Sequence, residues 1–481
     1  MAKALCVIWG VVLCMATIAG AAEQTARPLC RVVPTIKQRS PAELERALAE
    51  YDKLQQALTQ LQAQLNELQQ KGYDENKASI VAFEQRMIEL NGRLDSARND
   101  IDQLGSQRGC AVSRLYWYTD LAEAKAESVR RGRPILSLRM LGKLTDEYSC
   151  ANSRFFRTTL YSNKEVSDWL RTNFVLHWQC VRPVPRVTID FGDGRKLERT
   201  ITGNSAHYVF ASDGTPLDVL PGLYSPLAFR QHLWDACDFY GKYTAAPSAD
   251  RRAMLQAYHQ SKADEAMKQW DFDIQRLGEQ RAELVSTRIK SAIEFARLSG
   301  QSAPAAGPAP KAAVAARQAV VKSFAEAPTI RFAKLGGTWM ERGMDDDVWQ
   351  AIATLHREDV KLDDASVAVV RKEFPAAVAM RAAVSKSRQE DPVLRMVRAF
   401  EDSIALDTVR NEYLLHRRVH EKFAANDTVA TNYDALNEWV YAELFLTPSS
   451  DPWLGLAPND IYTGLDNDGR TEAAPVPQSG G

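Results

Sequence analysis

The chain is predicted to fold as an α/β domain that follows a helical hairpin and precedes an all-α region. Three observations predict this fold class. Apolar residues recur in heptads over residues 41–105, apolar strands alternate with amphipathic helices over 112–243, and helical spacing dominates from 249 to 465. A length of 481 residues is sufficient for two or three hydrophobic cores.

The composition excludes some classes of binding partner. The chain has 60 basic and 61 acidic side chains, with a formal net charge of −1, so no strong field attracts nucleic acid or an anionic membrane. A hydrophobic content of 45% is that of an ordinary globular protein. No phosphate-binding loop, dinucleotide fingerprint or serine-histidine-acid arrangement is visible. We therefore predict no cofactor and no nucleic-acid partner.

Residues 1–22 have the pattern of a secretory signal peptide. Lys3 supplies the charge, residues 4–18 form the apolar core, and small residues at 19–21 suit cleavage after Ala21 or Ala22. Cleavage predicts a secreted or periplasmic protein without a membrane span. The uncharged run is about 18 residues long, so an uncleaved anchor is the alternative.

Cleavage would leave an odd number of cysteines in an oxidising compartment. At least one thiol would then be free or would pair with another chain. The five that remain are Cys30, Cys110, Cys150, Cys180 and Cys237.

The heptads of residues 41–105 predict an antiparallel coiled-coil hairpin that turns near Gly72. Such a hairpin either packs only on itself or recruits another protein. Folding back brings its two open ends together, so we expect a Cys30 to Cys110 disulfide at the base. The repeated apolar positions are Leu44, Tyr51, Leu58 and Leu65 with Ala47, Leu54, Leu61 and Leu68, then Ile80, Met87, Leu94 and Ile101 with Phe83, Leu90, Ala97 and Leu104.

The α/β region, residues 112–243, is arranged around Cys150. Thr119 or Asp120 is expected to cap a first helix, and the apolar run 134–141 predicts a buried strand. A short loop then places Cys150 in the first turn of a second helix. Unpaired backbone N-H groups and the helix dipole at such a position favour thiolate over thiol.

The elements after Cys150 complete an alternating order. A helix is predicted over 164–172, a strand over 174–181, a hairpin from 187–191 and 195–201 with glycines at its turn, a strand over 207–211, a second short strand, and a helix over 226–240.

This order, the strand at Pro134, the segment Cys150-Ala-Asn-Ser153 and the segment 208–214 resemble the thioredoxin-like superfamily, in particular its uncharacterised exported bacterial members. The resemblance covers residues 115–240 and implies a central mixed sheet flanked by helices. It departs from the family pattern twice. Ser153 replaces the second cysteine of Cys-x-x-Cys, and Ser205 stands where the family usually has a cis-proline.

With Ser153 and Ser205 at these positions, the chemistry that the family pattern still allows is disulfide exchange by a single thiol. Cys150 can attack a protein disulfide to form a mixed disulfide, with Ser153 donating a hydrogen bond to the thiolate. Cys180, expected at the same edge of the sheet, is the candidate resolving cysteine; the alternative is that it is a small buried hydrophobe. His207 is a weaker candidate for holding the thiolate, and the alternative is a packed strand histidine.

The C-terminal part is predicted to be helical. One long helix, or two in line, covers 249–299, an alanine and proline linker covers 300–310, a bundle of helices covers 311–465, and residues 466–481 form a disordered tail.

His416 and His420 are the candidate metal ligands of this region. They lie four residues apart on a helix, so both imidazoles can face one way, as metal-binding histidines often do, and Glu412 or Glu421 can add a ligand. Two arginines, at 417 and 418, argue against a cation site. We therefore predict no metal centre, and the favoured interpretation is an exposed or interface pair on a charged helix face.

Two functions from different classes follow. The first is an atypical thiol-disulfide oxidoreductase that acts on envelope proteins through Cys150. The second is a redox-inactive scaffold that binds protein partners through the coiled coil and the helical bundle.

Overall fold

The structure, a computed structural model, describes residues 39–71, 73–200, 204–278, 346–373, 392–425 and 427–454. All of them belong to one unit, Gln38–Gly481. Among the helices in these ranges, none is both long and apolar enough to cross a bilayer. The predicted signal peptide, the 300–310 linker, the 466–481 tail and Cys30 lie outside the described residues.

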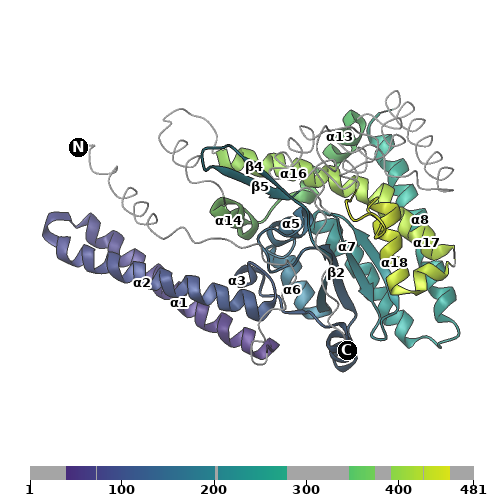
Figure 1. Cartoon of the computed structure of the whole chain (residues 1–481), viewed down its shortest axis with the longest axis horizontal. Coiled ribbons are helices and arrows are strands. Elements are labelled where there is room, and N and C mark those ends of the chain that lie inside the picture. The colour runs from purple at the N-terminus through teal and green to yellow at the C-terminus, as the bar shows by residue number, and fades with distance from the viewer. Residues whose placement is uncertain are drawn as a thin grey trace. The chain divides into compact units, whose positions relative to one another are not determined.

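The α/β part contains the alternating elements that the sequence predicts (Figure 1). Asp120 is confirmed as a helix cap, since its carboxylate accepts from the backbone N-H of Ala122 at 2.7 Å and of Glu123 at 3.0 Å. The elements are α3 (Cys110–Ser113), β1 (Trp117–Tyr118), α4 (Leu121–Arg131), β2 (Ile135–Leu141), α5 (Ala151–Thr159), α6 (Lys164–Asn173), β3 (Val175–Arg182), β4 (Arg186–Asp190), β5 (Lys196–Thr200), β6 (Ser205–Phe210), β7 (Pro216–Pro221) and α7 (Pro226–Ala245).

Five strands form a mixed sheet in the order β1-β3-β2-β6-β7. Strands β1, β3 and β2 are parallel, and β6 and β7 continue the sheet as antiparallel strands. The central strand β2 is buried along its whole length, as its apolar run predicts. The carboxyl ends of β2 and β3 therefore meet at one edge of the sheet, beside the start of β6.

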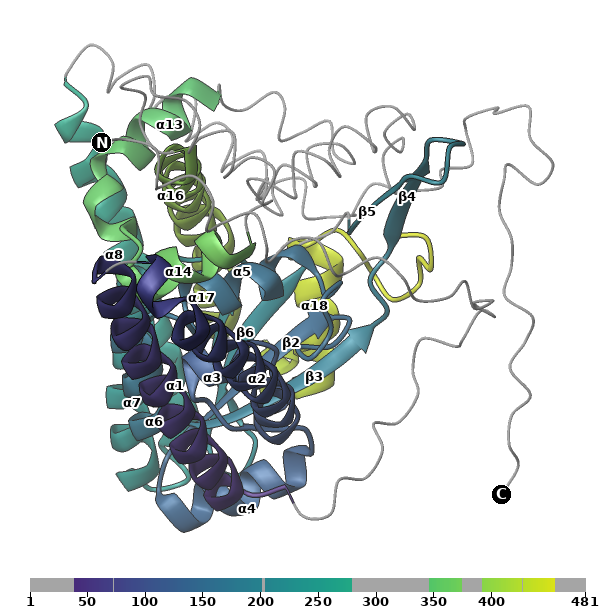
Figure 2. The ribbon, with the colours of Figure 1, turned by 90° about the vertical axis from the view of Figure 1, so that its left-hand side faces the viewer.

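Helices cover both faces of this sheet (Figure 2). On one face His207 of β6 contacts Phe156 of α5 and Phe229 of α7, with ring centroids 4.6 and 4.8 Å apart. On the other face Tyr208, the next residue along β6, contacts Tyr433 and donates a hydrogen bond to Asn437 at 3.1 Å. Successive residues of a strand point to opposite faces, so both faces of β6 lie under helices.

The strands β4 and β5 form a separate two-stranded sheet, in the predicted hairpin. It stands apart from the five-stranded sheet in both views (Figures 1 and 2). Gly192 and Gly194 adopt positive φ at its turn.

The N-terminal part is the predicted pair of long helices, α1 (Pro41–Gln70) and α2 (Tyr73–Gly105). They run side by side in both views, and Arg98 of α2 donates to the Tyr51 hydroxyl of α1 at 3.0 Å. Leu44, Leu94 and Ile101, all heptad residues, are buried in their shared core. The hairpin thus buries its apolar seam between its own helices near the base.

The predicted bridge at that base stays a prediction because Cys30 is not described. Cys110 is fully buried, and its thiol donates to the carbonyl oxygen of Leu115 at 3.3 Å. Gly105 lets this sulfur approach the end of α2, since a Cβ on Gly105 would lie 2.2 Å from Cys110 Sγ.

The C-terminal region is helical, as predicted, and its described helices share a core with the α/β part. The buried residues of the sheet, of α8 and of the later helices form one continuous core. The elements are α8 (Arg251–Arg276), α13 (Asp346–Leu355), η1 (Arg357–Val360), α14 (Asp364–Glu373), α16 (Pro392–Arg410), η2 (Asn411–His416), α17 (Arg417–Ala424), η3 (Thr428–Thr431), α18 (Tyr433–Trp439) and η4 (Val440–Leu444).

The helix predicted over 249–299 is represented by α8, which ends at Arg276. Gly278 stops it, because its φ of +90° belongs to the left-handed region. The rest of the predicted helix lies beyond the described residues.

Candidate functional site

Cys150 lies at the start of α5, where the sequence predicts it. It is the N-cap residue, and its backbone N-H donates to the carbonyl oxygen of Leu141 at 3.1 Å, which ties the helix start to the end of β2. The side chain is 0% exposed and belongs to the hydrophobic core. At this position the helix dipole favours the thiolate, whereas desolvation by burial disfavours it.

Ser153 is also fully buried, and its contacts differ from the predicted hydrogen bond to the thiolate. Its hydroxyl lies 2.8 Å from the carbonyl oxygen of Cys150 and 2.8 Å from Ser149 Oγ. These contacts join the hydroxyl to oxygen atoms of the first turn. The role they support is stabilisation of the helix start.

Cys180 reaches the same edge of the sheet as Cys150, as expected. It pairs with Met140 in the β2–β3 ladder, one residue before the Leu141 carbonyl that accepts from Cys150. Ser205 faces the same Met140 from β6, so Cys150, Cys180 and Ser205 border one end of β2. The described residues contain no cis peptide bond, and Ser205 starts a strand with a trans bond.

His207 has the environment of the alternative interpretation, a packed strand histidine, rather than that of a partner for a thiolate. The imidazole is fully buried on the α5 and α7 face, where its Nε2 lies 2.7 Å from the Tyr161 hydroxyl. Burial lowers the pKa of His207 to about 3, so the ring is neutral at physiological pH.

The C-terminal segment 440–454 covers the edge where Cys150 and Cys180 lie. The Tyr441 hydroxyl donates to the carbonyl oxygen of Asn204 at 3.3 Å, and the Asn204 amide donates to Thr447 Oγ1 at 2.8 Å. Arg182, at the end of β3, donates to the carbonyl oxygens of Pro448 and Asp451 at 3.2 and 3.3 Å. The segment is therefore bonded to the ends of β3 and β6.

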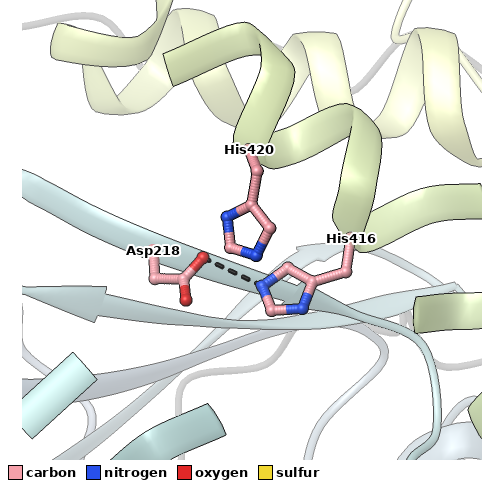
Figure 3. A group of neighbouring side chains, drawn as sticks. All are labelled: Asp218, His416 and His420. Atoms are coloured by element: carbon pink, nitrogen blue, oxygen red, sulfur yellow. Dashed lines mark hydrogen bonds and ion pairs between the residues drawn. The ribbon is translucent and has the colours of Figure 1, made fainter. Parts of the chain in front are cut away.

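A second group of polar side chains lies beside β7, the outermost strand of the sheet. Asp218 of β7, His416 of η2 and His420 of α17 are buried, and each offers a ligand atom within 4.8 Å of the other two. Figure 3 shows the three side chains pointing toward one another. His416 Nε2 lies 3.0 Å from Asp218 Oδ1. Of the two alternatives expected for this pair, exposed or at an interface, the exposed one is wrong, since His416 and His420 are only 2% and 4% exposed.

The electrostatics of Asp218 follow from this arrangement. Burial alone would raise the pKa of its carboxyl, but the charge and hydrogen bond of His416 hold it far below its usual value. The backbone N-H of Val219 adds a donor to the same oxygen at 2.8 Å. Asp218 is thus a carboxylate in a buried site.

Two further histidines surround this group, so four of the seven in the chain gather here. His259 of α8 places Nδ1 2.8 Å from Nδ1 of His420 and Nε2 2.9 Å from the carbonyl oxygen of Leu217. Burial lowers the pKa of His259 to about 4. His232 of α7 packs its ring 4.7 Å from that of His416.

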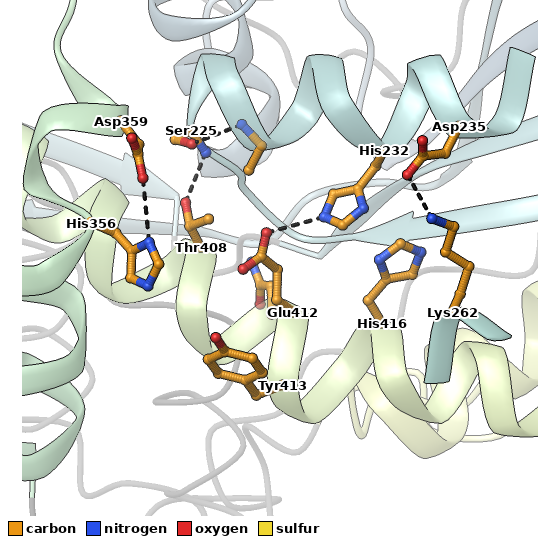
Figure 4. A network of polar contacts seen from close by, with 12 residues as sticks. Ser225, His232, Asp235, Lys262, His356, Asp359, Thr408, Glu412, Tyr413 and His416 are labelled. Atoms are coloured by element: carbon orange, nitrogen blue, oxygen red, sulfur yellow. Dashed lines mark hydrogen bonds and ion pairs between the residues drawn. The ribbon is translucent and has the colours of Figure 1, made fainter. Parts of the chain in front are cut away.

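A cavity of about 900 Å³ opens beside these histidines. Figure 4 shows the polar contacts along it, contributed by α7, α8, α16, η1 and η2. His232 Nε2 lies 3.1 Å from Glu412, and Lys262 donates to Asp235 at 2.8 Å. Burial would lower the pKa of His232, but the hydrogen bond and charge of Glu412 raise it. His416 and His420 both line the cavity.

Sequence reasoning found His416 and His420 by their spacing but missed Asp218, His232 and His259. One signal for Asp218 was present, because an acidic residue interrupts the apolar strand Leu217-Asp-Val-Leu220. The two helix histidines carry no such mark, because a histidine is common on a partly buried helix face.

Comparison of the chain with protein-family models, with curated proteins and with solved structures gave no match. We therefore infer the function from the geometry of the two sites.

Proposed function

We propose that this protein is an exported thioredoxin-like protein whose Cys-x-x-Ser edge is closed by its own C-terminal segment, so that it acts as a redox-inactive scaffold. The order of elements and the mixed five-stranded sheet support the thioredoxin-like fold, because this is the architecture that the resemblance implies. The pattern of residues 1–22 supports export.

The proposal depends on one observation, the complete burial of Cys150 beneath the hydrogen-bonded segment 440–454. Thiol-disulfide exchange requires a thiolate to reach a substrate sulfur in line, which a 0% exposed side chain in the core does not allow. The segment 440–454 occupies the edge where a substrate peptide would approach. It is fixed there by backbone oxygens that accept from Arg182 and by the side chains of Tyr441 and Thr447.

In a scaffold, the α1–α2 hairpin is the surface that contacts a protein partner in the cell envelope. Val81 and Ile88 of α2 support this assignment, because they are exposed and lie one heptad apart on the same face of the helix. A Val81→Lys, Ile88→Lys variant would leave the free energy of unfolding nearly unchanged and weaken binding of a partner isolated with the wild type. Unchanged binding would remove the hairpin from the proposal.

A disulfide-reduction assay with the mature protein tests the scaffold proposal. We expect no turnover of an insulin-type protein disulfide above that of a Cys150→Ser variant, with circular dichroism showing that both proteins are folded. Turnover that Cys150→Ser abolishes would overturn the proposal.

A second candidate function is monothiol exchange with Cys180 as the resolving residue. It is favoured by one observation, the placement of Cys150 and Cys180 around the same end of β2. Mass spectrometry after mild oxidation tests it. A Cys150 to Cys180 disulfide that forms and is reduced without unfolding would favour exchange over the scaffold.

A further inference from the structure

We propose that Asp218, His416 and His420 bind a divalent transition-metal ion of the Zn²⁺ class. Two imidazole nitrogens and one carboxylate oxygen are a donor set that such ions take in proteins, with metal-ligand distances of about 2.0–2.2 Å. The three side chains come from three different elements, β7, η2 and α17, and converge in a buried place (Figure 3).

The separations suit a single ion. Two ligands about 2.1 Å from a tetrahedral metal lie about 3.4 Å from each other. The contact between His416 Nε2 and Asp218 Oδ1, at 3.0 Å, is close to that spacing, and no pair in the group exceeds 4.8 Å. Closing the widest separation requires a movement of at most about 1.4 Å, which small side-chain rotations supply.

The outer contacts leave a lone pair of His420 for the metal. A carbonyl oxygen only accepts, so His259 Nε2 carries the hydrogen that it donates to Leu217. The two Nδ1 atoms of His259 and His420 lie 2.8 Å apart and share one hydrogen, which His420 donates when Nδ1 of His259 accepts. Nε2 of His420 is left as the acceptor. Outer partners that fix the tautomer in this way are typical of histidine ligands.

The two arginines that argue against a cation are held elsewhere. Arg417 pairs with Glu421 at 3.4 Å and lies 3.3 Å from Met267 Sδ, while Arg418 donates to the carbonyl oxygen of Glu443 at 3.1 Å. On a helix, these positions are rotated by about 100° and 200° from His416. Arg417 and Arg418 therefore have partners outside the group of three ligands. Asp218 supplies a negative charge for the ion.

The site has a path to the solvent and room for a further ligand. His416 and His420 line the 900 Å³ cavity together with Glu412 and His232. Figure 4 shows three of these side chains, His232, Glu412 and His416. Three protein ligands leave at least one position of a Zn²⁺ ion open, as in catalytic zinc sites. The turn that carries Glu412 and His416 is a π-helix, a distortion often found at functional sites.

Metal titration of the full mature protein, freed of tags and metals, tests the proposal. We expect one Zn²⁺ per chain by calorimetry, with binding weakened by about 100-fold or more in Asp218→Asn and His420→Ala, since even outer-shell changes cost about 10–100-fold. His259→Ala, an outer-shell change, would weaken binding by about 10–100-fold. The matched control is His356→Gln, which alters another histidine of the same cavity and would leave the affinity unchanged.

X-ray absorption of the zinc-loaded wild type keeps the test independent of how the variants fold. Two imidazoles and one carboxylate oxygen at about 2.0–2.2 Å are expected. Absence of one-to-one binding, a shell without imidazole, or equal affinity in wild type and folded His420→Ala would overturn the proposal and leave Asp218 and His416 as a buried hydrogen-bonded pair.

Discussion

Titration of His207 gives a loss of stability at acid pH whose sign and size follow from the structure. The ring is enclosed by Phe156, Phe229 and the Tyr161 hydroxyl, and burial lowers its pKa to about 3. In the unfolded chain the pKa is about 6.5. Between these values the unfolded state binds a proton that the folded state excludes, so the free energy of unfolding decreases as the pH falls.

The magnitude is about 1.4 kcal/mol per pH unit over that window. Lowering the pH from 7 to 5 therefore costs about 2 kcal/mol through His207 alone. His177, whose pKa is also lowered to about 3 by burial, adds a similar loss of stability. The contribution of His207 must therefore be measured separately, with a variant that changes only this residue. His207→Gln does this, because glutamine does not titrate and its amide can still bond to Tyr161.

Urea unfolding at pH 7 and pH 5, in metal-free buffer and followed by tryptophan fluorescence, measures the difference. The wild type is expected to lose about 2 kcal/mol more than His207→Gln between the two pH values. Equal losses in the two proteins would refute a neutral, buried His207.

Two glycine substitutions test close packing. Gly222→Ala forces an alanine to φ +86° with its Cβ 2.5 Å from Asn411 Nδ2, so we expect the free energy of unfolding in urea to fall by about 2–4 kcal/mol. The control Gly192→Ala, at φ +76° in open space, should lower it by only about 1 kcal/mol. Similar losses in the two variants would contradict the contact with Asn411. Gly105→Ala is expected to cost about 1–3 kcal/mol, because its Cβ would lie 2.2 Å from Cys110 Sγ and 2.9 Å from the carbonyl oxygen of Leu115. Cys110→Ala in the same chain should restore only the part of that loss that comes from the sulfur, and fully additive effects would exclude the sulfur clash.

Much of the fold could be predicted because its signals are local. The apolar run of β2, the heptads of α1 and α2, and the cap at Asp120 each specify an element from neighbouring residues. The position of Cys150 at a helix start follows in the same way.

The cover over the sheet could not be predicted, since it depends on pairs far apart in the sequence. Tyr208 meets Asn437 and Arg182 meets Pro448, and nothing in either local segment indicates its partner. The expectation of a helical bundle gave the right secondary structure without showing that its helices would complete the core of the α/β part.

The candidate metal ligands show the same limit. Spacing placed His416 and His420 on one face, but the flanking arginines suggested exposure. Long side chains can extend away from a buried face, as Arg418 does toward Glu443. The charged neighbours therefore did not indicate whether the two histidines are buried. Asp218, 198 residues from His416, became a partner only through the fold.

The closed Cys150 edge is tested most directly by the rate at which iodoacetamide alkylates each cysteine, followed by mass spectrometry. In the native mature protein we expect Cys150 to react at least about 100-fold more slowly than in urea, because modification requires opening of the segment that covers it. Tyr441→Ala, which removes a fully buried side chain of that cover, should accelerate the reaction. Rapid native alkylation of Cys150, unchanged by Tyr441→Ala, would contradict the account.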